Sequence, residues 1–176
     1  MTATATGRLG TFDGRDAVVF ERTFTAPITD VWAAVTESDR LERWIGTWTG
    51  DPASGSVRFR MNAEGDDVPE ATYVIERCEP PRLLGIKAGD SAGVWTLAVE
   101  LSESGGVTTL RLSQVIEDPD QIESTGAGWD YYLDRLVTAE AGGDVSSFDW
   151  DRDYWPALRG HYTDLHTDLR KRLGAG

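Results

Sequence analysis

Few polar side chains in this sequence are placed where they could act on a bound molecule. Three of them, Arg22, Tyr73 and Gln114, fall on the apolar side of segments that alternate as half-buried strands do. A buried arginine needs a partner, because an unpaired charge in a dry interior costs several kcal/mol. Arg22 therefore either pairs with a carboxylate of the same chain, the interpretation we favour, or binds an anionic ligand. Gln114 could bond a ligand carbonyl or hydroxyl, unless it lies at a strand end and meets water.

Aromatic side chains are the other candidates for a binding site. The sequence has 7 tryptophans, 5 tyrosines and 5 phenylalanines, and large rings with polar tips can line an apolar pocket that also offers hydrogen bonds. The alternative is that these rings only fill the core. The candidate ligand-binding set on predicted inward faces comprises Arg22, Phe59, Tyr73, Trp95, Gln114, Trp129, Tyr132, Leu133 and Leu136.

No residue pattern typical of a catalytic or metal centre is present. His161 and His166 are five positions apart on a predicted helix, so they point about 140° away from each other and cannot chelate one metal. Asp149, Asp151 and Asp153 alternate as in a calcium loop, but the glycine and the terminal glutamate of that loop are missing. HExxH, paired-cysteine, GxSxG and phosphate-loop motifs are absent from the sequence. We expect no metal, no cofactor and no acyl-transfer chemistry.

A long helix over residues 118–143 is expected to position the candidate residues. Asp118 can accept a hydrogen bond from the amide of Gln121, Pro119 suits the first helical position, and glycines 142 and 143 supply a left-handed stop. At about 1.5 Å per residue the helix would run over roughly 35 Å, enough to cover a sheet. Its apolar face comprises Ile122, Trp129, Tyr132, Leu133, Leu136 and Val137.

Two further pairs of residues lie within this helix. Asp130 and Asp134 are one turn apart beside the apolar face and are expected to be solvated. Gly126 and Gly128 predict close packing of the helix on a sheet rather than a phosphate loop.

The sequence before the long helix predicts a sheet. Alternating apolar and polar residues joined by short turns indicate antiparallel strands with one buried face, over 17–25, 56–62, 70–79, 83–88, 92–102 and 107–116. Two short helices are expected after the first strand, one ending at Glu37 and one running from Asp39 to about Ile45 and Gly46. A last helix over 151–173 is expected to dock on its own domain, with a dimer contact as the alternative.

Size and charge limit the classes of partner. The 176 residues are enough for one domain, expected over 17–176 after a flexible tail at 1–16. A net charge of −13 argues against nucleic acid and anionic membranes, and leaves basic partners or neutral small molecules. Cys78 is the only cysteine, and the sequence contains neither a signal-like start nor a continuous apolar stretch of about 20 residues. We expect a cytoplasmic protein that does not insert into membranes.

The segments RTFTAPITDVWAAVTESDRLERWIG and GWDYYLDRL, together with the strand spacing, resemble the SRPBCC or START-like (Bet v 1-like) superfamily, in particular the branch named after activators of the heat-shock protein 90 ATPase. The resemblance covers about residues 17–143. It implies an α+β helix-grip fold, in which a curved antiparallel sheet wraps around a long C-terminal helix and leaves a cavity. It also implies two short helices after the first strand and an extra C-terminal helix.

Members of this superfamily bind lipids, hormones or polyketides, act as cyclases, or serve as co-chaperones, so the fold alone does not choose a function. We expect a module that binds a hydrophobic or aromatic small molecule in the cavity. The alternatives are a chaperone-activator-like module that contacts another protein and an enzyme of the cyclase type. Both a monomer and a homodimer are compatible with the sequence.

Overall fold

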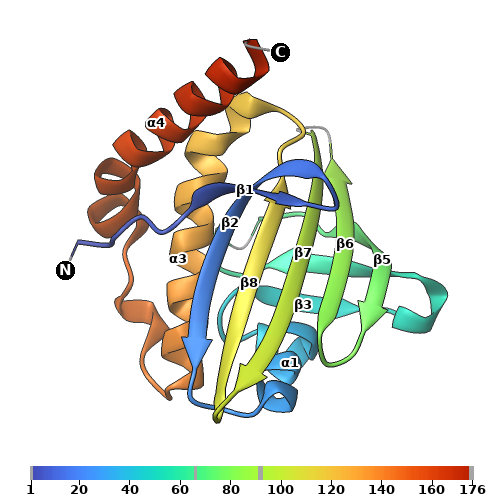
Figure 1. Ribbon diagram of the computed structural model, residues 1–176. Helices are drawn as coiled ribbons and strands as arrows, with labels where there is room; N and C mark the ends of the chain where they lie inside the picture. The colour runs from blue at the N-terminus through green and yellow to red at the C-terminus, as the bar shows by residue number, and fades with distance from the viewer. Residues whose placement is uncertain (1, 66, 91–92, 175–176) are drawn as a thin grey trace.

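In the part of the chain that the structure describes, residues 2–65, 67–90 and 93–174, eight antiparallel strands form one curved sheet. Figure 1 shows this computed structural model. Neighbouring strands follow the order β1-β2-β8-β7-β6-β5-β4-β3. The strands are β1 (Arg8–Phe12), β2 (Arg15–Phe24), β3 (Gly46–Thr49), β4 (Ser56–Met61), β5 (Ala71–Glu79), β6 (Leu83–Asp90), β7 (Gly93–Ser104) and β8 (Val107–Val115).

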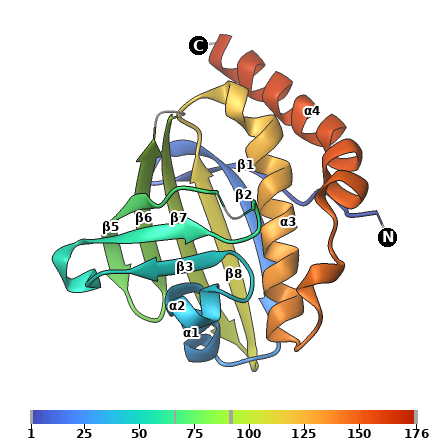
Figure 2. The same ribbon diagram turned by 180° about the vertical axis from the view of Figure 1, so that it is seen from behind.

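The helices lie at the edge and the lower end of this sheet. They are α1 (Ile28–Thr36), α2 (Ser38–Leu41), α3 (Ile122–Glu140) and α4 (Trp155–Gly174). Figure 2 shows α3 running along β2 on the inner side of the sheet, α4 packed on the side of α3 that faces away from the sheet, and β3 crossing in front of the central strands. We call the face of the sheet toward α3 the concave face. This arrangement confirms the predicted helix-grip fold. None of the described helices has the length and apolar character needed to cross a membrane.

The strand faces follow the predicted alternation. Phe20 of β2 pairs with Leu112 of β8, which pairs with Val99 of β7, so these residues share the concave face. Strand β3 was not predicted, because its four residues are too few to show a period. The helix that was expected to reach Gly46 ends at Leu41, and Gly46 begins β3, which pairs with β4.

The N-terminal segment is wrongly predicted as a flexible tail. It contains β1, which pairs with β2 through a turn at Asp13 and Gly14. Figure 1 shows this hairpin lying across the outer face of the central strands. The Asp13 carboxylate lies 3.5 Å from the Arg77 guanidinium, and Arg111 donates a hydrogen bond of 3.2 Å to the Thr11 carbonyl. Polar contacts made across the sheet therefore order a segment whose own sequence carries little apolar pattern.

The start of α3 differs from the prediction by one turn. Residues Pro119–Gln121 form a 3₁₀ turn, and the Asp118 carboxylate accepts a hydrogen bond of 3.0 Å from the Asp120 amide, not from that of Gln121. The predicted stop is confirmed, since α3 ends at Glu140 and Gly142 has a left-handed φ of 74°.

Helix α4 packs on α3, as predicted for the last helix. It follows a π-helical turn, Trp150–Tyr154, and buries Leu158, Tyr162 and Leu169. A Cβ atom at Gly126 would come within 2.3 Å of the Tyr162 ring, so this glycine allows α3 to approach α4. The expectation that Gly126 and Gly128 pack on the sheet is wrong, because a Cβ at Gly128 would meet no described atom within 4 Å.

Candidate functional site

The central strands place a row of four residues, two of them aromatic, on the concave face. Val57 of β4 pairs with Tyr73 of β5, Tyr73 pairs with Ala88 of β6, and Ala88 pairs with Trp95 of β7. We call these four residues the aromatic row. Because adjacent strands are about 4.8 Å apart, the backbones at Tyr73 and Trp95 are separated by roughly 10 Å. Ala88, which has only a methyl side chain, occupies the strand position between Tyr73 and Trp95.

A second row lies beside the aromatic row. Ile75 of β5 pairs with Ile86 of β6, Ile86 pairs with Leu97 of β7, and Leu97 pairs with Gln114 of β8. We call Ile75, Ile86 and Leu97 the aliphatic row, and the two rows together the concave apolar surface.

This surface is only partly covered. Tyr73, Trp95, Ile75 and Ile86 each keep part of their area exposed to solvent, whereas Ala88 and Leu97 of the same surface are buried. Leu133 and Leu136 of α3 are 1% and 0% exposed. The helix thus packs fully against the β2 side of the sheet and leaves the β5–β7 side less covered. Phe59 of β4 is buried and stacks on Tyr73, with ring centres 4.8 Å apart and planes inclined by 15°.

The polar tips of the candidate residues on α3 are hydrogen-bonded within the protein. The Trp129 indole N–H donates to Gln114 Oε1 over 2.5 Å, and the Tyr132 hydroxyl donates to Glu64 Oε1 over 2.8 Å. Burial, followed by the Glu64 carboxylate, raises the pKa of Tyr132 well above its usual range. Because an indole only donates, Gln114 presents its oxygen to Trp129 and keeps its amide N–H groups for another acceptor.

The void next to Gln114 and Trp129 is small. A crevice of about 10 Å³ separates the first turn of α3 from β2 and β8, which is room for roughly one water molecule. Gln114 and Trp129 are the candidate residues that line it. A wider hollow of about 390 Å³ lies on the opposite, outer face and is lined partly by charged residues, among them Glu21, Glu100 and Arg111.

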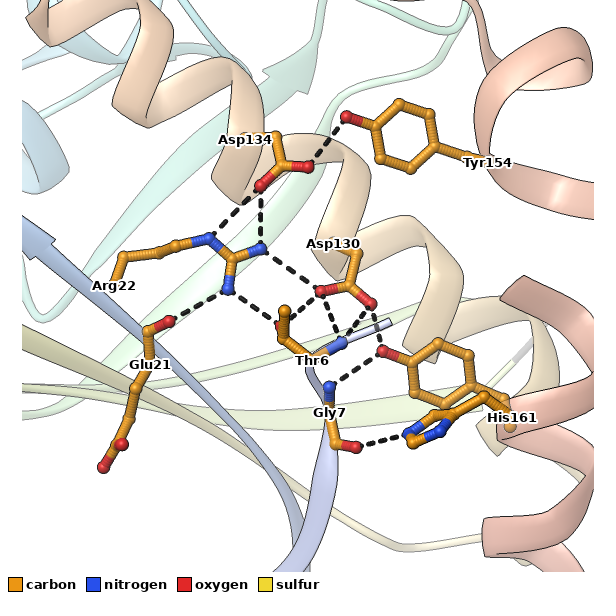
Figure 3. A network of polar contacts seen from close by, with 9 residues as sticks. Thr6, Gly7, Glu21, Arg22, Asp130, Asp134, Tyr154 and His161 are labelled. Carbon is orange, nitrogen blue, oxygen red and sulfur yellow. Dashed lines mark hydrogen bonds and ion pairs between the residues drawn. The ribbon is translucent and has the colours of Figure 1, made fainter. Parts of the chain in front are cut away.

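Arg22 belongs to a different site, a polar network between β2, α3 and α4 (Figure 3). Its guanidinium lies 3.2 Å from the Asp130 carboxylate and 2.9 Å from that of Asp134. The predicted internal ion pair is confirmed. The expectation that both aspartates are solvated is wrong, since Asp130 is 0% exposed and Asp134 is paired.

The N-terminal segment and α4 complete this network. Thr6 donates to Asp130 from its backbone amide, over 3.1 Å, and from its hydroxyl, and Arg22 donates to the Thr6 hydroxyl over 2.8 Å. The Tyr162 hydroxyl also donates to Asp130 and accepts the Gly7 amide over 3.1 Å. In the described contacts, the charged groups and hydrogen-bond donors of the network are therefore paired with one another.

Tyr154 joins the network from the π-helical turn, donating to Asp134 over 2.9 Å. Burial, followed by the nearby carboxylates, raises the pKa of both Tyr154 and Tyr162 above the usual tyrosine range. Neither hydroxyl is therefore a ready general base.

The two histidines contact other parts of the chain through their rings. His161 Nε2 lies 2.7 Å from the Gly7 carbonyl, and His166 lies 3.0 Å from Asp120. Among the described residues, no group of three or more histidine, cysteine or acidic side chains is arranged to hold a metal ion.

Sequence reasoning missed Glu64 and the role of Asp130. Glu64 lies in the loop between β4 and β5 without a periodic pattern, so its contact with Tyr132 had no sequence signal. The role of Asp130 did have a sequence signal. Asp130 and Asp134 are one turn apart beside an apolar helix face, so together they can pair with one inward-facing arginine on a neighbouring strand.

Comparisons with known proteins agree with this architecture. Residues 25–140 match the family model described as activator of Hsp90 ATPase homolog 1-like protein. The crystal structure of CalU16 from Micromonospora echinospora has a TM-score of 0.69 and 24% identity, over 94% of this chain and 99% of that one. A conserved protein of unknown function, EF2215 from Enterococcus faecalis, has a TM-score of 0.66 and 20% identity, over 93% and 91% of the two chains.

DynU16, a protein in the dynemicin biosynthetic locus, has a TM-score of 0.63 and 22% identity, over 73% of this chain and 49% of that one. A search of curated protein sequences gave no match. These three structural likenesses are below 25% identity and so establish the fold alone.

Proposed function

The chain belongs to the activator of Hsp90 ATPase homolog 1-like family, and from this membership and the concave apolar surface we propose that it binds a hydrophobic or aromatic small molecule between the sheet and α3. The observation that carries the proposal is the aromatic row, in which Tyr73 and Trp95 flank Ala88 and stay partly exposed. Partly covered apolar side chains of this kind favour contact with an apolar ligand, because that contact removes them from water.

The proposed ligand contacts follow from this arrangement. Tyr73 and Trp95 would sandwich or flank a ring above Ala88, Phe59 would support Tyr73 from behind, and Gln114 would offer amide donors to a carbonyl or hydroxyl. Trp129 and Tyr132 would bound the site from α3, whose Leu133 and Leu136 hold the helix to the sheet. Arg22 is left out of the proposed ligand contacts, because its guanidinium is held by two carboxylates.

A binding screen with a blocking variant tests this function. Lipids, flavonoids and polyketides are added to the protein, and tryptophan fluorescence and the melting temperature are recorded. A compound that binds the native protein should bind Ala88→Phe at least about tenfold more weakly, because the added ring would occupy the position that we propose for the ligand, between Tyr73 and Trp95. The matched control is Val74→Phe, which adds a ring at an exposed position on the other face of β5.

Two results would count against ligand binding at this surface. One is a panel that leaves both fluorescence and melting temperature unchanged. The other is equal loss of binding in the Ala88 and Val74 variants, which would place the compound elsewhere. Native mass spectrometry of protein purified from its own host adds an independent readout, because a retained ligand adds a defined mass.

A second candidate function is contact with another protein. It is favoured by the small volume of the crevice beside Trp129, about 10 Å³, and by internal hydrogen bonds at the tips of Trp129 and Tyr132. An acidic surface of net charge −13 suits a basic partner. The discriminating assay is the ATPase rate of heat-shock protein 90 with and without this chain. Unchanged ATPase activity, together with a compound that binds in the screen, would favour the ligand-binding function.

The cyclase-type alternative gains no support from the described side chains. On the concave apolar surface they are apolar or aromatic, with Gln114 and Glu64 beside them. Neither forms a nucleophile with its base.

A further inference from the structure

We propose that the concave apolar surface selects ligands by charge: it takes an uncharged or positively charged aromatic molecule and rejects anionic ones such as carboxylates and sulfonates. This inference rests on the proposed small-molecule binding and adds the class of ligand. It follows from where the chain places its charged side chains relative to the two faces of the sheet.

The described positions on the concave face of β4 to β8 carry no basic side chain. Residues there alternate with those of the outer face, and the basic residues of these strands fall on the outer side. Arg58 pairs with Thr72 of β5 and bonds Glu70 over 2.7 Å, while Lys87 pairs with Val74, which is 44% exposed. An anion on the concave apolar surface would therefore meet no guanidinium or ammonium group from these strands.

Two arginines near the concave side, Arg22 and Arg135, already hold partners within the protein. Arg22 of β2 serves two carboxylates at once, Asp130 and Asp134. Arg135 of α3 donates to the carbonyls of Trp44 and Val145, over 2.9 and 3.2 Å. Recruiting either side chain would strip a buried carboxylate or a backbone carbonyl of its donor.

The charge that does lie beside the site is negative. Glu64 accepts the Tyr132 hydroxyl over 2.8 Å, so a carboxylate lies at the edge of the proposed site. The whole chain carries −13, which adds a repulsive field for anions. A carboxylate or sulfonate entering here would lose water without gaining a positively charged partner, and the amide of Gln114 alone would not compensate for the lost hydration. A neutral ring avoids this penalty, and a cationic ring is attracted by the faces of Trp95 and Tyr73.

Two fluorescent probes that differ by one sulfonate test the selection. N-phenyl-1-naphthylamine is neutral, and 8-anilinonaphthalene-1-sulfonate is the same ring system with a negative charge. We expect the neutral probe to bind the native protein at least about tenfold more tightly. The measurement is repeated at high salt, which screens the long-range repulsion between the acidic protein and the sulfonate. The difference in affinity between the two probes should persist in large part, because salt does not supply the cationic side chain that the site lacks.

Two matched variants locate the selection. Ile86→Arg puts a cation in the aliphatic row and should strengthen binding of the sulfonate probe about tenfold, whereas Val74→Arg makes the same charge change on the outer face and should alter it by less than about threefold. Circular dichroism checks that each variant folds. Ile75→Arg, in the same row as Ile86, replaces Ile86→Arg if that variant does not fold.

The outcomes separate the two proposals. Equal binding of the two probes to the native protein, or an equal effect of the arginines at 74 and 86, overturns charge selection and leaves small-molecule binding standing. Failure of both probes to bind refutes the charge selection together with the binding site on which it rests. A neutral probe that binds tightly, with a sulfonate probe rescued only by an arginine on the concave face, supports both.

Discussion

Replacing Asp130 by asparagine removes one negative charge from the buried network and keeps the size of the side chain. Within the described residues, the four groups that hydrogen-bond to the Asp130 carboxylate are donors: the Thr6 amide and hydroxyl, the Arg22 guanidinium and the Tyr162 hydroxyl. An asparagine can accept with one atom only, and its NH₂ group would face donors in either orientation. The isosteric substitution therefore cannot restore the network.

The size of the effect follows from burial. Asp130 is 0% exposed and the Arg22 side chain is 11% exposed, and removing one partner of a buried ion pair destabilises proteins by about 3–5 kcal/mol. Arg22 keeps Asp134 at 2.9 Å, so we expect a loss near the lower limit, about 3 kcal/mol. In a chain of this size, 1 kcal/mol lowers the melting temperature by about 2–4 °C, which gives a decrease of roughly 6–12 °C.

Urea and thermal unfolding of the purified variants measure this effect, with Glu21→Gln as the control. Glu21 pairs with Arg8 at 3.2 Å, and their side chains are 48% and 53% exposed, so this equal charge change should cost less than about 1 kcal/mol. If Asp130→Asn unfolds at the same urea concentration as Glu21→Gln, the network does not stabilise the fold as argued. An intermediate variant, Tyr162→Phe, removes one donor and should fall between the two.

Two further properties of the helices can be tested in the same preparations. Gly126→Ala should lower the free energy of unfolding by about 1–3 kcal/mol, because its methyl group would clash with the Tyr162 ring. Gly128→Ala should raise it by about 0.5–1 kcal/mol, since its methyl group meets no described atom and alanine favours the helix; effects of the same sign would contradict this packing. Burial is the larger cause, and nearby carboxylates the smaller cause, that raises the pKa of three tyrosines above the ordinary value of 10.0. Their protonated forms therefore contribute their full stability below pH 10.0, and this contribution is lost as the pH rises above that value. Absorbance titration should show tyrosinate forming near pH 10 in fewer groups in the native protein than in urea, and identical titrations would contradict the burial of Tyr132, Tyr154 and Tyr162.

The faces of the strands could be predicted from the sequence because their cause is local. Side chains alternate from one residue to the next, so Phe59, Tyr73, Trp95 and Gln114 follow from the pattern of their own segments. The end of α3 was predictable for the same reason, since Gly142 acts within one turn.

The parts that could not be predicted depend on partners distant in sequence. β1 is ordered by pairing with β2 and by bonds to Arg77 and Arg111, which lie more than sixty positions away. The burial of Asp130 depends on Arg22 of β2, Tyr162 of α4 and Thr6 of the segment before β1. Periodicity within a helix gives the direction of a side chain but not the element that covers it.

The position of α3 connects the polar network with the proposed binding surface. Asp130 and Asp134 attach one side of the helix to β2 and α4, while Trp129 and Tyr132 point toward Gln114 and Glu64. An ion pair with the edge-side strand β2 holds the helix near that strand. The helix therefore fully covers the β2 side of the core and leaves the aromatic row on β4 to β7 only partly covered. The same ion pair engages the Arg22 guanidinium, which could otherwise have neutralised an anionic ligand. One buried interaction therefore leaves the concave apolar surface partly exposed and also limits the charge of the ligands that can bind there.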